Sequence, residues 1–540
     1  MKTLLTILLF LTGLGAHAQA ADWTFLLPVA DLNGVMAIAT GPDGSSYVTG
    51  RFVGSLALGT TTLRSTAPGQ CLYVAKCSPT GQVLRATLLE GATSVLPRAI
   101  TVDAAGNCYV TGSFRGTLSY NQGQHTTAQT MAPGGTDIFL LRCGPGGRVR
   151  WVSQATGGTS ASSCTGIGVA TDCAGNSYIT GSANGDNLRF GNQTFGARRF
   201  QGFVASYDAA GQLRWARVWD NPAPGFSSSP GGAVAVDNAG NCYVSGTSLR
   251  GWTLDGITLL SPNNTVFLAR FGTRTGRLQW ALATPGEGDG RALALDQRGD
   301  VYLGGSFSGT VAFGPVSLTS AGDADGFVAR YDPSGDVDWA TALGGPNYDV
   351  VSDLAVSQRS RQVFATGLRN FTPAGTNQSF LARLGTSGRV QQLVLVAGPG
   401  TSSCSKLALD AQNNVYSTGI FTGNCQFGPL ARSTTATSAY FGRYGSRLVL
   451  AAASEAADAQ AAIFPNPAQA QLTIRLPERA RAARATLYNQ LGYAVAERQA
   501  VSSAPSADIT FDTSALPNGL YTLRLEADQY RSSQLVVVQH

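Results

Sequence analysis

Five carboxylates gather around the fifth of a series of related segments in this 540-residue sequence. They are Glu287, Asp289, Asp323, Asp325 and Asp349. Carboxylate pairs supply the acid and the base of glycoside cleavage, and carboxylate oxygens are also the ligands that Ca²⁺ prefers. The cluster therefore predicts either a Ca²⁺ site or the catalytic pair of a polysaccharide hydrolase or lyase. The alternative interpretation is that these acids are solvated loop residues.

Few residues are available for histidine-based chemistry, because the sequence contains only three histidines. A Ser-His-Asp or Cys-His set would have to use His125, which lies in a loop rich in Gln and Thr, because His540 is the last residue. No two histidines have the spacing of zinc ligands, and no acidic run has the spacing of an EF-hand loop. We therefore expect no cofactor other than the Ca²⁺ ion considered above.

Aromatic and basic residues in the longer loops form a second candidate site, for binding rather than catalysis. They are Trp252, Phe200, Phe371, Arg198 and Arg199. Such side chains bind sugars and peptides, and long loops on a rigid scaffold usually carry function. Several of these loops also contain short hairpin patterns, for example at 56–59 and 311–314, so some of the aromatics are expected only to pack those hairpins.

A ten-residue stretch at 103–112, Asp-Ala-Ala-Gly-Asn-Cys-Tyr-Val-Thr-Gly, recurs along the first 450 residues. Its aromatic residue falls at steps of 52–69 residues, at Tyr47, Tyr109, Tyr178, Tyr243, Tyr302, Phe364 and Tyr416. Internal periods of this length indicate repeat arrays or propellers.

Each repeat contains four segments with the features of short strands. An alternating strand precedes a D-x-x-G-N turn, the Y-V-T-G strand follows, then an F-V-A-R-Y strand, and last a strand that contains tryptophan, as at Trp151 and Trp215. Four antiparallel strands in each of seven repeats predict an all-β chain with a seven-bladed β-propeller over 21–450. A single strand-like segment at 23–28 is expected to complete the seventh blade and close the ring.

The regular recurrence of the aspartate, asparagine and tyrosine favours a scaffold role for them. Glycine and asparagine tolerate the positive φ of a tight hairpin, and Tyr-Val-Thr is expected to fill the space between blades. Functional residues are therefore expected where the copies differ.

These motifs resemble the bacterial β-propeller repeat family of the SBBP type, whose pattern is G-x-D-x-x-G-N-x-Y-V-T-G followed by D-x-F-V-A-K. The resemblance covers about residues 22–450 and is most specific in repeats two to five. The sixth repeat, at 357–364, has lost the Asp and the Asn. The resemblance implies the propeller fold and a secreted or surface location, but no particular chemistry.

The first twenty residues have the features of a secretory signal peptide. Lys2 is followed by an apolar run at 4–14 and by small residues at the cleavage position. No later apolar run reaches the roughly 18 residues that a transmembrane helix needs. The net charge of +6 is spread along the chain without a basic run among aromatics, which argues against nucleic-acid binding.

The nine cysteines are expected to be small buried residues rather than disulfide partners. Two repeat positions each hold two of them, Cys108 with Cys242 and Cys77 with Cys143. Equivalent positions in different repeats should lie too far apart for a disulfide bond. A bridge between Cys404 and Cys425 across one hairpin stays open as the alternative.

The segment at 463–540 differs from the repeats and follows an alanine-rich linker at 451–462. Alternating strands at 472–474, 485–492, 509–511 and 534–538 are separated by proline and Asn-Gly turns. This pattern predicts a small Ig-like β-sandwich.

The same segment is similar to the type A sorting domain of the type IX secretion system. The resemblance rests on F-P-N-P at its start, L-Y-N-x-L-G, D-T-S-x-L-P-N-G-L-Y and a final run of valines, and its motif residues are Pro465, Asn466, Pro467, Gly519 and Tyr521. It implies recognition by the type IX machinery and, often, removal of the domain within the linker. The chain departs from the family by ending in Val-Gln-His, where members often carry a lysine.

We expect a monomer that is secreted or attached to the outer-membrane surface. Its predicted function is non-enzymatic binding or adhesion to an extracellular glycan or protein. The alternatives are a polysaccharide hydrolase or lyase that uses the carboxylates of the fifth repeat, and a structural component of a surface layer.

Overall fold

The computed structural model describes the chain in two compact units, Met1–Val449 and Leu450–His540. The described residues are 35–120, 125–126, 135–158, 162–185, 187–196, 201–219, 230–261, 263–370, 377–396, 398–427, 430–444, 462–475, 482–489, 494–501, 508–527 and 530–540. All their regular elements are β-strands. None of the described residues forms a helix long and apolar enough to span a membrane.

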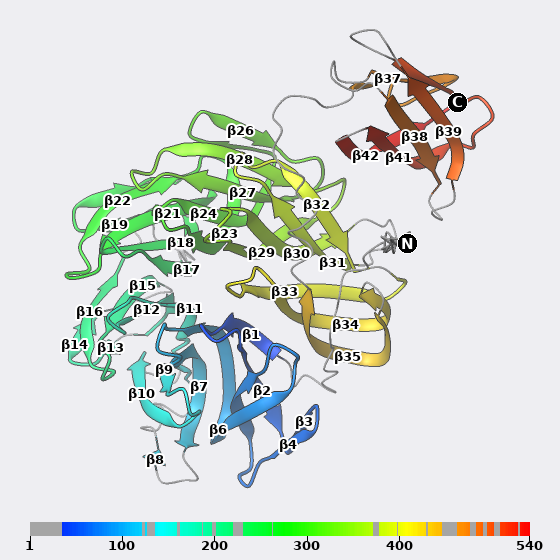
Figure 1. The fold of residues 1–540 in the computed structure, drawn as a ribbon. Coiled ribbons are helices and arrows are strands. Elements are labelled where there is room, and N and C mark those ends of the chain that lie inside the picture. The colour runs from blue at the N-terminus through cyan, green and yellow to red at the C-terminus, as the bar shows by residue number, and fades with distance from the viewer. Residues whose placement is uncertain are drawn as a thin grey trace, which may run out of the picture. The chain divides into compact units, whose positions relative to one another are not determined.

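The strands of the larger unit form antiparallel groups that follow the sequence repeats one by one (Figure 1). The first two groups share one long strand and run in the order β1 (Val35–Thr40), β2 (Ser46–Val53), β5 (Gln70–Cys77), β6 (Val83–Val102), β7 (Cys108–Tyr120), β9 (Asp137–Cys143) and β10 (Val149–Thr156). The third group is β11 (Thr165–Thr171), β12 (Ser177–Ala183), β15 (Gln201–Tyr207) and β16 (Leu213–Val218). The fourth is β17 (Gly231–Val236), β18 (Asn241–Leu249), β21 (Asn264–Gly272) and β22 (Leu278–Ala283).

The remaining groups continue the same order. The fifth is β23 (Glu287–Leu295), β24 (Val301–Ser308), β27 (Asp325–Tyr331) and β28 (Val337–Leu343). The sixth is β29 (Asp349–Val356), β30 (Val363–Asn370), β31 (Asn377–Leu384) and β32 (Val390–Leu395). The seventh has three described strands, β33 (Thr401–Leu409), β34 (Val415–Phe427) and β35 (Leu430–Tyr444).

Short hairpins extend from the connections between second and third strands, as the sequence predicted. They are β3 (Ser55–Leu58) with β4 (Thr61–Arg64), β13 (Leu188–Phe190) with β14 (Gln193–Phe195), β19 (Trp252–Leu254) with β20 (Ile257–Leu259), and β25 (Thr310–Phe313) with β26 (Val316–Thr319). A two-residue strand, β8 (His125–Thr126), pairs with β7.

The first and seventh groups pack against each other, so the groups form a closed succession (Figure 1). One buried cluster contains Val48 and Tyr73 of the first group together with Tyr416 and Phe441 of the seventh. The segment predicted to complete the seventh group, 23–28, lies outside the described residues. The all-β propeller architecture is therefore present, and the closing strand stays a prediction.

The recurring aspartate organises the turn that follows it. Asp103 Oδ1 accepts the backbone N–H of Ala105 (3.0 Å) and of Asn107 (2.8 Å). Its Oδ2 accepts the Asn107 amide (2.8 Å) and lies 3.2 Å from the Tyr109 hydroxyl. Comparable arrangements surround Asp172, Asp237, Asp296 and Asp410. The repeated carboxylate is thus engaged by its own hairpin, which is the scaffold role that the sequence predicted.

Tyrosine and tryptophan side chains join several groups to the next one. The Tyr109 hydroxyl lies 3.3 Å from the Gly175 carbonyl, in the turn of the following group. Fourth-strand indoles donate to turn carbonyls in the same direction at 2.8–3.1 Å, namely Trp151 to Ala209, Trp215 to Thr273 and Trp339 to Thr386. These aromatic rings, buried or half-buried and hydrogen-bonded at their polar ends, therefore supply apolar contact between groups and fix the orientation of one group on the next.

The sixth group, whose turn lacks the usual aspartate, contacts its neighbour through an arginine. Arg361 Nε lies 2.9 Å from Asp296 Oδ2, and its Nη2 lies 3.0 Å from Asp300 Oδ2. Both aspartates are buried. Because a buried carboxylate is costly unless it is paired in close geometry, this ion pair is a structural contact. The turn that departs from the repeat pattern thus contributes an ion pair between the fifth and sixth groups.

Each first strand carries a β-bulge against its Y-V-T-G partner strand. The register shifts at the same place in all seven groups, and the bulged residues are Met36, Arg98, Ile167, Gly232, Arg291, Ser352 and Ser405. A bulge adds one residue to a strand and changes the direction of its side chain.

The glycine of Y-V-T-G faces this bulge. Gly305 pairs with Gly290, the residue just before the bulged Arg291. A Cβ atom at Gly305 would overlap the carbonyl oxygen of Asp289. The same overlap with a partner-strand carbonyl recurs at Gly112, Gly181, Gly246, Gly367 and Gly419. The glycine is therefore needed for close approach of two backbones.

The cysteines are all unpaired in the structure, and eight of the nine are buried. Cys404 and Cys425 are not bonded, so the alternative bridge is not formed. Cys108 and Cys143 lie directly opposite each other on β7 and β9, a proximity within one repeat that the comparison of repeat positions overlooked. Burial raises the pKa of Cys143 to about 12, which keeps its thiol protonated at neutral pH.

Two sheets of the smaller unit enclose one core. The first sheet is β36 (Ala462–Phe464), β37 (Gln471–Arg475) and β40 (Asp508–Asp512). The second is β39 (Ala494–Val501), β38 (Ala482–Tyr488), β41 (Gly519–Ala527) and β42 (Tyr530–Val538). Leu472 and Ile509 of the first sheet share a buried cluster with Leu487, Leu523 and Val536 of the second. Two sheets around one core fit the predicted sandwich, and its Ig-like topology stays a prediction.

Substitution of Gly305 by alanine should destabilise the larger unit by about 1–3 kcal/mol or more, because the new methyl group overlaps a backbone carbonyl. Urea unfolding measures the loss. The matched control is Gly146→Ala, since a Cβ atom there meets nothing within 4 Å. Similar losses in both variants would contradict the assignment of Gly305 to the bulge.

Thiol titration with Ellman's reagent should detect nine thiols in the unfolded protein. In the folded protein one thiol, that of the exposed Cys173, should react rapidly, because the other eight are buried. Seven thiols after unfolding would instead indicate one disulfide bond, for which Cys108 and Cys143 are the closest pair in register.

Candidate functional site

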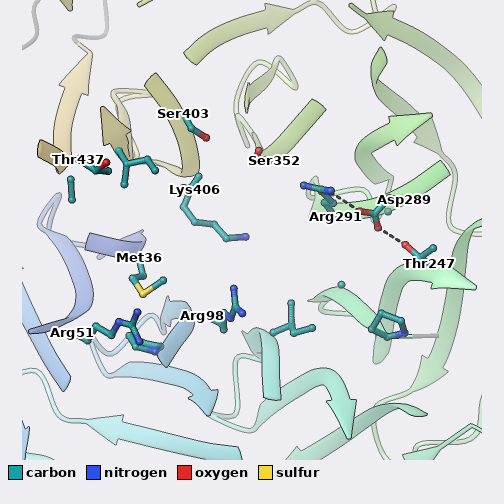
Figure 2. A pocket seen from close by; sticks show the side chains of 18 residues that line it. Met36, Arg51, Arg98, Thr247, Asp289, Arg291, Ser352, Ser403, Lys406 and Thr437 are labelled. Carbon is teal, nitrogen blue, oxygen red and sulfur yellow. Dashed lines mark hydrogen bonds and ion pairs between the residues drawn. The ribbon is translucent and has the colours of Figure 1, made fainter. Parts of the chain in front are cut away.

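The seven bulged residues line one cavity at the centre of the larger unit (Figure 2). The cavity has a volume of about 660 Å³, and every group contributes to its wall. Ligand pockets commonly span about 300–1,000 Å³, so the volume is that of a binding site. We call this cavity the channel mouth. Its shape is set by the scaffold, while its chemistry depends on which residue occupies the bulge in each repeat.

A smaller cavity of about 170 Å³ adjoins the channel mouth and is lined by the first strands of all seven groups. It shares Ile167, Gly232 and Lys406 with the channel mouth. Its other lining residues are mostly small or aliphatic, such as Ala37, Ala99 and Ala233. Asp353 and Lys406 are the charged side chains among its described lining residues.

Four cationic side chains reach the channel mouth. Arg98 and Arg291 are bulged residues, Lys406 follows the bulge of β33, and Arg51 comes from β2. Figure 2 shows Arg98, Arg291 and Lys406 pointing into the open centre from different sides, with Arg51 beside Arg98. Burial and the like charge of Arg51 lower the pKa of Arg98.

Two carboxylates accompany two of these cations. Asp289 Oδ2 lies 2.6 Å from Arg291 Nε, and Asp289 also accepts a hydrogen bond from Thr247. Asp353 Oδ1 lies 3.7 Å from Lys406 Nζ, and its other oxygen accepts the backbone N–H of Leu407 (3.0 Å). Burial raises the pKa of Asp353, and Lys406 opposes that shift.

The other two cations have no carboxylate partner among the described residues. Arg51 Nη1 lies 3.4 Å from Gln70 Oε1 and 3.5 Å from the Val95 carbonyl, which are both neutral acceptors. Arg98 makes no hydrogen bond or ion pair with a described residue. The described channel mouth therefore has more positive than negative side chains and is suited to an anionic group.

The carboxylates that the sequence singled out do not form one cluster. Asp289 lines the channel mouth, whereas Glu287 and Asp323 are exposed elsewhere on the fifth group. Asp325 and Asp349 are 2% and 1% exposed, respectively. Within the described part of the chain, no three His, Cys, Asp or Glu side chains are placed to hold a metal ion. The predicted Ca²⁺ site is not assembled from these residues.

Asp325 and Asp349 are held at the junction of the fifth and sixth groups. Asp325 Oδ2 accepts the N–H of Ala321 (3.0 Å), and Asp349 Oδ2 accepts that of Gly345 (2.7 Å). Arg369 Nε lies 3.8 Å from Asp349 Oδ1. Burial lowers the pKa of Arg369, and both carboxylates oppose that shift. These contacts describe a buried ionic cluster that fixes loops, and the sequence analysis did not include its arginine.

The aromatic ligand-binding candidate that the structure describes, Trp252, is a core residue. Its side chain is fully buried, and its ring lies 5.6 Å from that of Trp219 and 5.5 Å from that of Phe267. It fixes the β19–β20 hairpin and offers no surface to a ligand, which corrects the expectation for this residue. Phe200, Phe371, Arg198 and Arg199 lie outside the described residues.

The motif residues of the smaller unit contact its last strand. Asn466 Oδ1 accepts the N–H of Val537 (2.8 Å), between the exposed Pro465 and Pro467. Gly519 pairs with Val538 at the start of β41. The buried Tyr521 donates its hydroxyl hydrogen to the Pro517 carbonyl (2.8 Å).

Substitution of Asp325 by alanine should destabilise the protein by about 1–3 kcal/mol, because it leaves the Ala321 N–H unpaired and removes a charge beside the buried Arg369. Thermal unfolding measures this change. Asp323→Ala is the matched control, since that side chain is exposed two residues away. A stable Asp325→Ala protein that has lost a Ca²⁺-dependent increase in melting temperature would instead support a metal site.

The solved structures that align with this chain share little sequence identity with it. A quinohemoprotein alcohol dehydrogenase from Comamonas testosteroni shares 11% identity at a TM-score of 0.36, over 82% of this chain and 79% of the dehydrogenase. An ulvan lyase, described as a new family of polysaccharide lyase, shares 12% identity at a TM-score of 0.38, over 73% of this chain and 93% of the lyase. No curated protein matches the sequence. None of these likenesses carries an inference about activity.

Two family models match parts of the chain. Residues 150–189 match the Beta-propeller repeat, and residues 462–539 match the Secretion system C-terminal sorting domain. Both resemblances predicted from the motifs are thereby confirmed. The chain therefore carries a β-propeller repeat and a C-terminal sorting domain of the type IX secretion system, and it is secreted or attached to the outer-membrane surface.

Proposed function

We propose that the larger unit is a non-enzymatic extracellular binding module whose ligand enters the channel mouth. The observation that carries this proposal is the convergence of one bulged residue from each of the seven groups on a single 660 Å³ cavity. A rigid scaffold that presents different side chains at equivalent positions is suited to recognition, because little conformational entropy is lost when a ligand binds.

The carboxylates support binding better than hydrolysis. Glycoside cleavage needs two carboxyl groups on either side of the scissile bond. Asp289 is engaged by Arg291 and Thr247, and Asp353 lies deeper, beside Lys406. No second carboxylate is among the described residues that line the channel mouth, so Asp289 has no partner there for such a pair.

The sorting domain places this binding module outside the cell. Passage across the outer membrane brings the channel mouth into contact with extracellular glycans and proteins. Adhesion or capture of such a molecule is therefore the function that the site and the location support together.

A screen of the mature protein against an array of extracellular glycans and proteins tests the proposal. We expect retention of at least one class of ligand without product formation. Ser352→Trp should weaken that binding by about tenfold or more, because the larger side chain fills the channel mouth. Ser317→Trp is the control, since Ser317 is exposed on the β25–β26 hairpin, outside the channel mouth.

Three results would contradict the proposal. Equal loss of binding in both tryptophan variants would place the site elsewhere. Release of oligosaccharide products that is abolished by Asp289→Asn or Asp323→Asn would indicate a hydrolase or lyase. No ligand at high protein concentration would favour a structural role in a surface layer.

Deletion of residues 463–540 should leave the protein in the periplasm, because the sorting domain is the part that the type IX machinery recognises. Cell fractionation with detection of the larger unit measures this outcome. A folded, truncated protein that still reaches the surface would contradict the role of the domain.

A further inference from the structure

We propose that the channel mouth binds the carboxylate or sulfate groups of an acidic polysaccharide, with Arg98 and Arg51 as the principal contacts. This inference rests on the proposed function and specifies the chemical class of its ligand.

The distribution of charge is the first reason. Four cationic side chains and one carboxylate, Asp289, line the cavity. Asp289 is paired with Arg291, and Asp353, which lines the smaller cavity, is paired with Lys406. Arg51 contacts neutral acceptors, and Arg98 has no hydrogen-bond or ion-pair partner among the described residues. An arginine fork that is not already occupied matches the two oxygens of a carboxylate or sulfate.

The proximity of two like charges is the second reason. Arg51 and Arg98 both line the channel mouth, where partial burial and the like charge of Arg51 lower the pKa of Arg98, whose side chain is still exposed. Such an arrangement costs free energy in the unbound protein. An anion between the two guanidinium groups would offset both contributions, so the site is preorganised for negative charge.

The remaining lining favours a glycan over an acidic peptide or a nucleic acid. Five residues with hydroxyl groups line the cavity, namely Thr247, Ser352, Ser403, Ser405 and Thr437. The Thr247 hydroxyl donates to Asp289 and can still accept, while the other four can donate to and accept from the hydroxyls of a sugar. No aromatic side chain is among the described lining residues, so nucleobases would lack the rings on which they usually stack. The cavity of about 660 Å³ has the size of a short oligosaccharide segment rather than of a duplex.

The two paired carboxylates would then act as competitors of the ligand. Asp289 holds Arg291, and Asp353 holds Lys406. Each of these acids also repels an approaching anion. Neutralisation of either acid should therefore strengthen binding, which is the opposite of what a catalytic acid or a cation ligand would show.

Isothermal titration of the mature full-length protein tests this inference. The probes are hexagalacturonate, a chondroitin sulfate hexasaccharide, neutral maltohexaose, hexaglutamate and a short thymidine oligonucleotide. Hexagalacturonate carries carboxylates alone and the chondroitin sulfate hexasaccharide carries carboxylates and sulfates, so tighter binding of the second sugar would indicate recognition of sulfate. The variants are Arg98→Gln, Arg51→Gln, Asp289→Asn and Asp353→Asn, with Arg64→Gln as the control for loss of one positive charge at an exposed position on β4.

At least one acidic hexasaccharide should bind. Its affinity should fall when the ionic strength is raised about tenfold, from 50 to 500 mM NaCl. Arg98→Gln should weaken binding by about tenfold or more, and Arg64→Gln by less than about twofold. Asp289→Asn should strengthen it by several-fold. Thermal melts of each variant show whether a loss reflects unfolding.

The inference is overturned if maltohexaose binds as well as the acidic sugars, or if Arg98→Gln and Arg64→Gln behave alike. Tighter binding of hexaglutamate or of the oligonucleotide would assign the site to another class of polyanion. Binding of neutral maltohexaose that Ser352→Trp blocks would leave the proposed function intact. A glycan and protein array that yields no ligand would contradict the proposed function itself.

Discussion

Close backbone approach between the first and second strands of each repeat is the constraint on which the rest of the larger unit depends. The glycine of Y-V-T-G has no Cβ atom, so the carbonyl opposite it can occupy that space. The first strand accommodates this approach with a bulge, and the bulged residue lines the channel mouth. The glycine that recurs in the repeats therefore allows the bulge to form. The bulge is the position at which the repeats carry different residues.

Contacts between groups then fix the geometry of the ring. Tyr109 and Trp151 each reach a turn of the following group, so every group is oriented by its neighbour rather than by its own sheet alone. The sixth repeat, which lacks the turn aspartate, contacts the buried Asp296 of the fifth group through Arg361. A scaffold held in this way keeps side chains from seven groups in register around one cavity, which a set of mobile loops would not achieve.

The sequence was sufficient for the architecture, because the pattern of each repeat is local. Strand order, the hairpins after second strands and the scaffold role of Asp103 all follow from residues close together in the chain. The buried state of most cysteines was equally evident. The sorting domain was identified from motifs that span its whole length.

The site was predicted only in part, because it depends on contacts between repeats. Asp289 was identified, but it was grouped with Asp325 and Asp349, whose partner Arg369 lies on another strand and could not be inferred from spacing. Trp252 belongs to a residue type that often contacts ligands, but its side chain is buried in the core. A usable signal for Arg98 and Arg291 was present, since both stand five residues before the turn aspartate of their repeats.

A crystal structure of the mature protein with bound hexagalacturonate tests the central claim most directly. The account predicts electron density for the sugar in the channel mouth, with a carboxylate within hydrogen-bond distance of the Arg98 guanidinium. Density on the outer hairpins, or at the end of the channel formed by the D-x-x-G-N turns, would contradict it.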